Sequence, residues 1–340
     1  MAMNDSFGID LLEATQLTRA GRLAEATRAI QRALGQQPAR PGQTRARPGS
    51  VPLIEMPRGS AGEFIAGSYS HQHGTRPYKL YIPTSYTAGK ALPLVVMLHG
   101  CTQNPDDFAA GTQMNTIAEE RQCLVLYPAQ TKSANQSQCW NWFKRAHQRR
   151  DKGEPAIIAG MTREVLKRYG GDARKVYVAG LSAGGAMAAV MGAAYPDVYA
   201  AVGIHSGLPV GSAHDVASAF AAMGGAPSAS GAVAGRVVPA IVFHGDRDAT
   251  VHPRNGAQVA SQCVERHDES LDVVVQRGQV PGGHAYTCTV HKDAAGRIVL
   301  EHWEVHGAGH AWFGGSARGS YTDPKGPDAA REMLRFFLRS

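Results

Sequence analysis

Residues 176–194 read VYVAGLSAGGAMAAVMGAA. The opening VYVAG is an apolar run of strand length, and the helical pattern AGGAMAAVMGAA starts at residue 183. Between them lies the motif Gly180-Leu181-Ser182-Ala183-Gly184, of the form G-x-S-x-G, in the strand-to-helix context that this motif requires. A sharp turn there exposes the serine hydroxyl at the carboxyl edge of a sheet, and the glycines avoid collisions with neighbouring backbone. The stretch predicts a nucleophilic serine, Ser182.

Outward from this stretch, strand-like apolar runs alternate with helical patterns from about residue 60 onward. The expected strands are 78–82, 94–98, 124–127, 176–179, 201–204, 240–243 and 302–305, and the expected helices are 156–169, 183–194 and 327–338. Short, continuous apolar strands separated by helices indicate a mostly parallel sheet covered on both faces. We therefore predict the α/β class and, because of the serine turn, the α/β-hydrolase fold.

The N-terminal region has a different character. Residues 1–35 show helical spacing with a break at Ala20-Gly21, which predicts a helical arm that packs on the domain or on a partner. Residues 36–58 are rich in Pro, Gly and Arg, as in a flexible linker. The catalytic domain is expected at 59–340. Within it, the small-residue segment 208–236 forms either a small cap or a surface excursion.

A serine nucleophile needs a base, and the base needs an orienting acid. In this fold both follow the serine, the acid first. Asp246 and Asp248 follow one predicted strand, and His310 follows another. We assign the acid to Asp248, because the pattern HG-x-x-D-x-x-V carries it there in many hydrolases of this fold, and we interpret Asp246 as a turn or cap residue. The predicted triad is Ser182, Asp248 and His310.

The oxyanion of the reaction needs two backbone N–H donors. One is the amide of Ala183, at the start of the helix behind the serine. The second is assigned to the amide of Cys101, in the His-Gly turn that follows strand 94–98.

The other histidines near these segments are interpreted as structural. His302, His306 and His310 recur every four residues, but the first two lie in a strand-like run and glycines precede the third, so no shared metal-binding face is expected. His306 is taken as structural. His205 and His244 follow apolar runs and are read as satisfied core histidines.

Three of the four tryptophans lie in segments around the predicted site. Trp140 and Trp142 belong to CWNWF, and Trp312 is two residues beyond His310. Such a group favours a partly exposed contact surface. We expect Trp140 and Trp312 to contact the substrate, whereas Trp142 could instead be buried.

Composition narrows the possible partners. The chain has 340 residues, of which 43% are hydrophobic and 19% charged, as in an ordinary globular protein. No apolar run approaches bilayer length, so no membrane partner is expected. The net charge of +7 is spread along the chain without a nucleic-acid motif, so no nucleic-acid partner is expected either. The five cysteines lack metal-ligand spacing, and no metal or other cofactor is required.

Several of these segments resemble the poly(3-hydroxybutyrate) depolymerase family of esterases. They are HGCTQ at 99–103, CWNWF at 139–143, GLSAGGAM at 180–187, HGDRDATV at 244–251, GAGHAWFGG at 307–315 and GSYTDPKGPDAAREMLRFF near the end. The resemblance implies a serine esterase that cleaves short-chain hydroxyalkanoate polyesters or their oligomers through an acyl-enzyme. Relatives of that family include feruloyl and acetylxylan esterases, which supply the alternative function. A non-catalytic binding protein is a third reading, which the intact triad opposes.

The resemblance also implies two disulfides, Cys101–Cys139 and Cys263–Cys288, with Cys123 free. The implied disulfides and the family favour an extracellular location. The N-terminus, however, lacks the basic start, continuous apolar run and cleavage site that a secretory signal requires, and this favours the cytoplasm. No polymer-binding domain follows the last predicted helix, so little attack on crystalline polymer is expected. The partner of the N-terminal arm is not indicated by the sequence.

Overall fold

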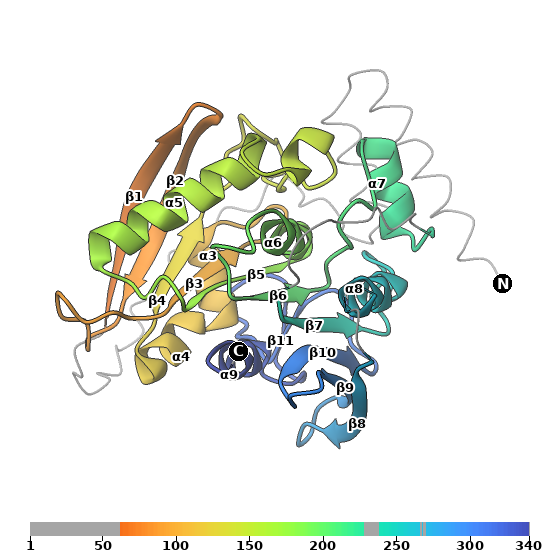
Figure 1. The fold of residues 1–340 in the computed structure, drawn as a ribbon. Helices are drawn as coiled ribbons and strands as arrows, with labels where there is room; N and C mark the ends of the chain where they lie inside the picture. Colours follow the sequence, from red (N-terminus) through yellow and green to blue (C-terminus); the bar gives the residue numbers. More distant parts are fainter. Residues whose placement is uncertain (1–61, 228–237, 266, 268–269, 340) are drawn as a thin grey trace, which may run out of the picture. The chain divides into compact units, whose positions relative to one another are not determined.

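The computed structural model describes residues 62–227, 238–265, 267 and 270–339 (Figure 1). The chain divides into two units, and all described residues belong to the second, Ser60–Ser340. The predicted arm (1–35) and linker (36–58) lie outside the described residues. None of the described helices combines the length and the apolar character needed to cross a membrane.

A ten-stranded mixed sheet forms the centre of the described unit. In spatial order its strands are β1 (Glu63–His71), β2 (Gly74–Ile82), β4 (Leu124–Pro128), β3 (Leu94–Leu98), β5 (Val176–Leu181), β6 (Ala201–His205), β7 (Ala240–Gly245), β10 (Ile298–Val305), β9 (Ala285–Lys292) and β8 (Asp272–Gln279). The six strands from β4 to β10 run parallel, and antiparallel pairs extend the sheet on both sides. The parallel centre agrees with the predicted α/β class.

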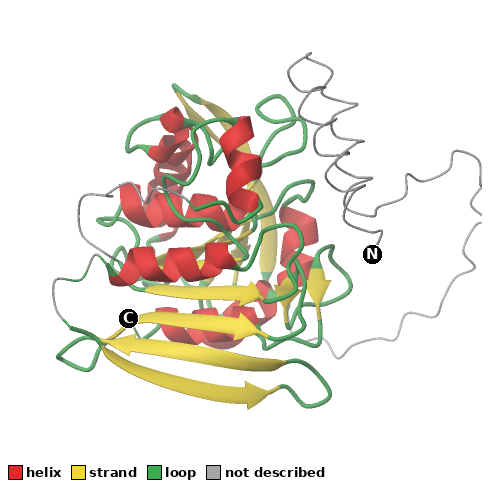
Figure 2. Cartoon of the chain, turned by 90° about the vertical axis from the view of Figure 1, so that its right-hand side faces the viewer, coloured by secondary structure: helices red, strands yellow, loops and turns green. Residues whose placement is uncertain are grey.

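Helices cover both faces of this sheet (Figures 1 and 2). One face packs against α5 (Gly153–Tyr169), α6 (Ala183–Ala194), α7 (Val216–Met223) and α8 (Arg254–Val264). The other face packs against α3 (Pro105–Thr112), α4 (Met114–Arg121) and α9 (Ala329–Phe337). A 3-10 turn, η1 (Arg145–Gln148), and a small parallel pair, β11 (Trp312–Phe313) with β12 (Thr322–Asp323), complete the described elements.

The central strands were predicted because both of their faces are covered. Every residue of β3, β4, β5, β6 and β7 is buried, which explains their continuous apolar sequences. The segment after β6 contains the eight-residue helix α7, and residues 228–237 within it lie outside the described part.

Buried neutral histidines make this fold sensitive to acid. Burial lowers the pKa of His99 and of His302 to about 4. His99 accepts the Gln130 N–H on Nε2 at 3.1 Å, while its Nδ1 lies 2.7 Å from the Gly100 carbonyl oxygen, so the neutral ring uses both nitrogens. In the unfolded chain these histidines regain a pKa near 6.5. Between about pH 6.5 and 4 the unfolded state therefore binds more protons than the folded state.

We therefore expect the free energy of unfolding to fall as the pH drops from 7 to 5. Each buried histidine contributes up to about 1.4 kcal/mol per pH unit in this window. Urea titrations at constant ionic strength measure the slope. His302→Gln should reduce this slope by up to the contribution of one proton. The control His214→Gln, at an exposed site, should leave the slope unchanged. A stability that does not vary between pH 7 and 5 contradicts this account.

Candidate active site

The predicted nucleophile lies in a sharp turn between β5 and α6. Ser182 has a φ of 58°, in the left-handed region that non-glycine residues rarely adopt. Its N–H donates to the carbonyl oxygen of His205, on the neighbouring strand β6, at 2.9 Å. The residue is half-buried, so the turn holds a strained serine at the carboxyl end of β5 with part of it open to solvent.

Two glycines of the motif permit this turn. A Cβ on Gly180 would overlap the backbone of Gly184, and a Cβ on Gly184 would overlap the carbonyl oxygens of Leu98 and His99. The first turn of α6 therefore lies directly against the end of β3. Only glycine at both positions lets the two backbones approach this closely.

The predicted acid and base are in contact. His310 Nδ1 lies 2.7 Å from Asp248 Oδ2. The other oxygen of Asp248 accepts the N–H groups of Thr250 at 2.9 Å and Val251 at 2.8 Å. Burial is the largest single influence on the pKa of Asp248 and would raise it, but the hydrogen bond and charge interaction with His310, together with the interactions with His244 and the Val251 N–H, outweigh burial and lower it. An ionised Asp248 accepts a hydrogen bond from the Nδ1–H of His310, which leaves Nε2 available as a base.

Asp246 has different contacts from Asp248. Its carboxylate accepts the Gly307 N–H at 2.7 Å and lies 3.1 Å from Nδ1 of His306. Nε2 of His306 lies 2.9 Å from the Thr287 hydroxyl. These contacts join the loop after β7 to the loop after β10, as expected for the turn residue that the sequence suggested.

Three of the described residues near the site carry groups that metals bind. Asp246, Glu304 and His306 bring one ligand atom each to within 4.8 Å of one another. Both carboxylates are exposed, and Asp246 and His306 are hydrogen-bonded to each other. This arrangement is explained by the loop contact and gives no reason to assign a metal.

His205 connects the two loops that carry the predicted nucleophile and base. Its carbonyl oxygen accepts the Ser182 N–H, and Nε2 of its ring accepts the Phe313 N–H at 3.1 Å. The ring is fully buried and stacks between Phe243 and Trp312. Burial lowers the pKa of His205 well below its usual value, which keeps Nε2 an acceptor. The core position was predicted, whereas this connecting role was not.

The predicted oxyanion donors come from the two segments beside Ser182. Ala183 is the first residue of α6, so its N–H has no acceptor within the helix. A Cβ on Gly100 would lie 3.7 Å from the Ser182 Cβ, which places the turn with Cys101 next to the serine. Two hydrogen bonds hold this turn. The Gly100 N–H donates to Gln103 Oε1 at 2.9 Å, and the Thr102 N–H donates to the Ser137 carbonyl oxygen at 2.6 Å. The oxyanion roles of Cys101 and Ala183 stay predictions.

One of the two disulfides implied by the resemblance is present. Cys101 and Cys139 are joined, with an S–S distance of 2.04 Å, which ties the turn beside Ser182 to the CWNWF segment. The second pairing is wrong, because Cys288 is a buried free thiol. Cys288 belongs to the core on one face of the sheet, whereas Cys263 packs against the core on the other face. The sheet itself therefore separates the two sulfur atoms.

The prediction that tryptophans form a substrate surface is also wrong. Trp140 is 0% exposed and Trp312 is 1% exposed, and Trp142 is buried as well. The ring of Trp140 lies 5.6 Å from that of His99, and the ring of Trp312 lies 5.0 Å from that of His205. These indoles fill the space beneath the site loops and support the histidines there. They cannot contact a polymer chain without rearrangement.

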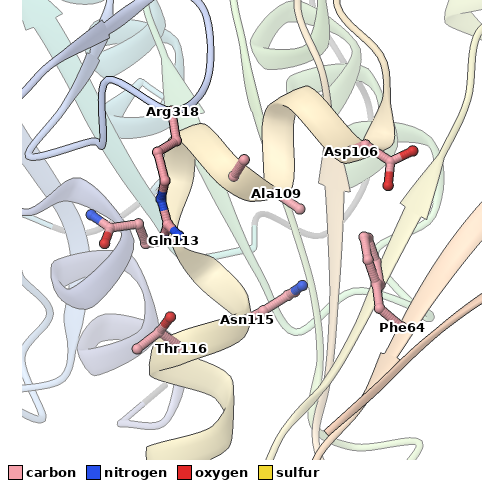
Figure 3. Close-up of a pocket in the computed structure, with 8 residues that line it drawn as sticks. Phe64, Asp106, Ala109, Gln113, Asn115, Thr116 and Arg318 are labelled. Carbon is pink, nitrogen blue, oxygen red and sulfur yellow. The ribbon is translucent and has the colours of Figure 1, made fainter. Parts of the chain in front are cut away.

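A cavity of about 300 Å³ lies beside α3 and α4 (Figure 3). Its lining includes Phe64 of β1, Asp106 and Gln113 of the helical segment, and Arg318. None of the predicted catalytic residues lines it, and Asp106 is already paired with Lys79 at 2.5 Å. We assign no function to this cavity.

Comparison with known proteins places these features in a wider group. A family model described as esterase PHB depolymerase matches residues 76–279, which include Ser182 and Asp248. Poly(3-hydroxyalkanoate) depolymerase C of Paucimonas lemoignei is 32% identical over 255 residues, which are 70% of this chain and 59% of the relative. Poly(3-hydroxybutyrate) depolymerase of Ralstonia pickettii is 30% identical, over 69% of this chain and 50% of the relative. This chain thus spans only half to three-fifths of these two proteins.

Further similarities support the fold. Probable acetylxylan esterase A of Aspergillus clavatus is 28% identical over 69% of this chain and 82% of its own length. The structure of an acetyl xylan esterase from Aspergillus awamori superposes with a TM-score of 0.60 at 20% identity, over 78% of this chain and 94% of that one. The predicted α/β-hydrolase fold is thereby confirmed.

Proposed function

This chain belongs to the esterase PHB depolymerase family, and on that basis we propose that it hydrolyses carboxylic esters with Ser182 as the nucleophile, His310 as the base and Asp248 as the acid. The observation that carries the proposal is the 2.7 Å contact between His310 Nδ1 and the buried Asp248, in a fold that also presents Ser182 in a strained turn. The three residues come from the carboxyl ends of β5, β7 and β10, where active sites of parallel sheets lie.

The proposed mechanism uses these three residues and two backbone amides. Nε2 of His310 takes the Ser182 proton as the serine oxygen forms a bond to the ester carbonyl carbon. The amides of Ala183 and Cys101 stabilise the oxyanion. Collapse of the tetrahedral intermediate breaks the bond to the leaving alcohol, which His310 protonates, and leaves an acyl-enzyme. Water then attacks with the same assistance and releases the acid, while Asp248 holds the tautomer of His310 throughout.

For the substrate we propose short-chain hydroxyalkanoate esters, either oligomers or amorphous polyester. The support is the names of two relatives, both polyhydroxyalkanoate depolymerases, at 32% and 30% identity. The alternative is an acetylxylan esterase, and it is favoured by a relative of that name that is matched over 82% of its length. Because Trp140 and Trp312 are buried, these two tryptophans do not argue for a polymer, and the choice rests on the relatives.

One experiment separates these substrates. The same enzyme preparation is given each substrate, and the product released is measured. The products are 3-hydroxybutyrate from oligomers and amorphous polymer, acetate from acetylated xylan, and ferulate from feruloylated xylan. Ser182→Ala protein supplies the background for each substrate. We expect hydroxybutyrate release to be the fastest. Faster acetate or ferulate release overturns the polyester proposal but leaves the serine esterase intact, whereas no serine-dependent hydrolysis of any ester overturns both.

For the location we propose an oxidising compartment outside the cytoplasm. The Cys101–Cys139 disulfide supports it, because structural disulfides persist in oxidising environments and are rare in the cytosol of most organisms.

Reduction of the disulfide should lower activity. The disulfide fixes the turn that carries the Cys101 amide. The loss of one oxyanion donor typically lowers kcat by about 10²–10³-fold. We therefore expect Cys139→Ser, or dithiothreitol on the parent, to lower kcat per folded molecule by about tenfold to a hundredfold.

Two controls accompany this measurement. The Cys123→Ser variant should lose activity in dithiothreitol as the parent does, because Cys123 is not in the disulfide. The Cys139→Ser variant should not respond further to the reductant. Full activity of reduced, folded protein would show that the disulfide does not position the donor.

A further inference from the structure

Strand β8 forms an edge of the sheet. Among the described residues it lies at the end of the strand order and pairs with β9 alone, as Figure 1 shows. Three consecutive valines on it are strongly exposed, Val273 at 54%, Val274 at 42% and Val275 at 51%. Edge strands of monomeric proteins usually carry lysine, proline or a bulge that discourages pairing with another chain. The sequence of β8, DVVVQRGQ, contains neither lysine nor proline.

The register with β9 shows which backbone groups of β8 point away from β9. The N–H of Val280 donates to the His284 carbonyl oxygen at 3.0 Å, so the groups of Val280 point toward β9. Along an antiparallel strand the direction of these groups alternates from one residue to the next. Even-numbered residues of β8 therefore bond to β9. The odd-numbered residues, among them Val273 and Val275, direct their N–H and C=O groups to the free edge.

We propose that β8 pairs antiparallel with β8 of a second copy of this chain, across a twofold axis at Val274. In this register Val273 of one copy lies opposite Val275 of the other, and the two Val274 side chains lie side by side. The backbone groups that meet are those of Val273 and Val275, which are outward-directed and form hydrogen-bonded pairs, whereas Val274 faces its copy as a non-hydrogen-bonded pair. The proposal does not depend on the esterase function.

Other registers fit less well. A shift that places Val274 opposite Val275 would bring an outward-directed residue against an inward-directed one, so the ladder could not form. An axis at Val275 keeps the ladder but places Val273 opposite Arg277. With the axis at Val274, Asp272 lies opposite Gln276 and Leu271 opposite Arg277, so no like charges face each other. The residues of β8 therefore complement those of a second β8 when the twofold axis passes through Val274.

Sedimentation measures the association directly. The full chain is expected to dimerise with rising concentration, and Val274→Lys should remain monomeric because two ammonium groups would meet at the axis. The matched control Val216→Lys changes an exposed valine on α7 and should dimerise like the parent. Hydrolysis of a short aryl ester should be equal in all three proteins, which shows that each is folded. A monomeric parent, or a Val274→Lys protein that still dimerises, overturns the proposal.

A cysteine at the axis tests the register. Residues that face each other in a non-hydrogen-bonded antiparallel pair have Cα atoms about 4.5 Å apart, which is within the range of a disulfide. Val274→Cys should therefore form a disulfide-linked dimer on mild oxidation. Val275→Cys should not, because its partner across the axis is Val273. Equal cross-linking of both variants, or of neither, overturns the register and with it the proposed pairing.

Discussion

Ser182→Ala should lower kcat for ester hydrolysis by about 10⁴–10⁶-fold, since loss of the nucleophile in a serine triad has effects of this size. The change removes one half-buried hydroxyl and leaves no core cavity, so the fold should persist. The proposed oxyanion donors and the Asp248–His310 pair are untouched, so a small residual rate above that in water is expected. Steady-state hydrolysis of a short aryl ester measures the loss, and the thermal unfolding midpoint verifies the fold.

A serine-directed organophosphate gives a second readout. The parent should be labelled at Ser182 alone, as located by peptide mass analysis, and Ser182→Ala should not be labelled. Ser133→Ala, which changes an exposed serine, is the control and should keep both the label and the activity. Activity near that of the parent in a pure, folded Ser182→Ala sample would rule out the proposed mechanism.

Asp248→Asn should lower kcat by about 10⁴-fold, because an amide in place of the carboxylate favours the wrong tautomer of His310. Nδ1 of His310 would then face an amide NH₂ group, which donates a hydrogen bond to it. The ring proton would move to Nε2, which would no longer be free to act as the base. The loss of negative charge also removes stabilisation of the imidazolium that forms in the reaction. Steady-state hydrolysis of a short aryl ester measures the loss in kcat.

Asp246→Asn is the matched control, two residues away. Asp246 binds Gly307 and His306 and does not contact His310, so its loss should affect loop stability more than chemistry. We expect a decrease in kcat of no more than about tenfold, together with a lower unfolding midpoint. If Asp246→Asn were the more damaging of the two in kcat, the assignment of the acid to Asp248 would be wrong.

The sequence predicted the strands that are buried on both faces and missed the strands at the edges. β3, β5 and β7 are continuous apolar runs because helices cover both sides, and this pattern is unambiguous. β8 has neither face buried, so its residues show no alternation that would mark a strand. Helices α3 and α4 were missed because each has only eight residues and a left-handed Gln113 separates them.

The predicted catalytic residues follow strands, and that relation can be read from the sequence. What the sequence could not provide is the direction in which a side chain points. Trp140 and Trp312 lie in segments near the site, yet their rings turn inward to pack on His99 and His205. The failed Cys263–Cys288 pairing has the same cause, because the two residues belong to opposite faces of one sheet. The link that His205 makes between Ser182 and Phe313 depends on the three-dimensional proximity of β5, β6 and the loop after β10.

That link has a consequence for how the protein responds to heat. The turn with Ser182 and the loop with His310 are both attached to one residue at the end of β6, which is itself a central, fully buried strand. Neither segment can separate from the other without breaking hydrogen bonds that reach into the sheet. Thermal inactivation should therefore coincide with cooperative unfolding of the sheet, with no earlier step in which the site melts while the scaffold remains.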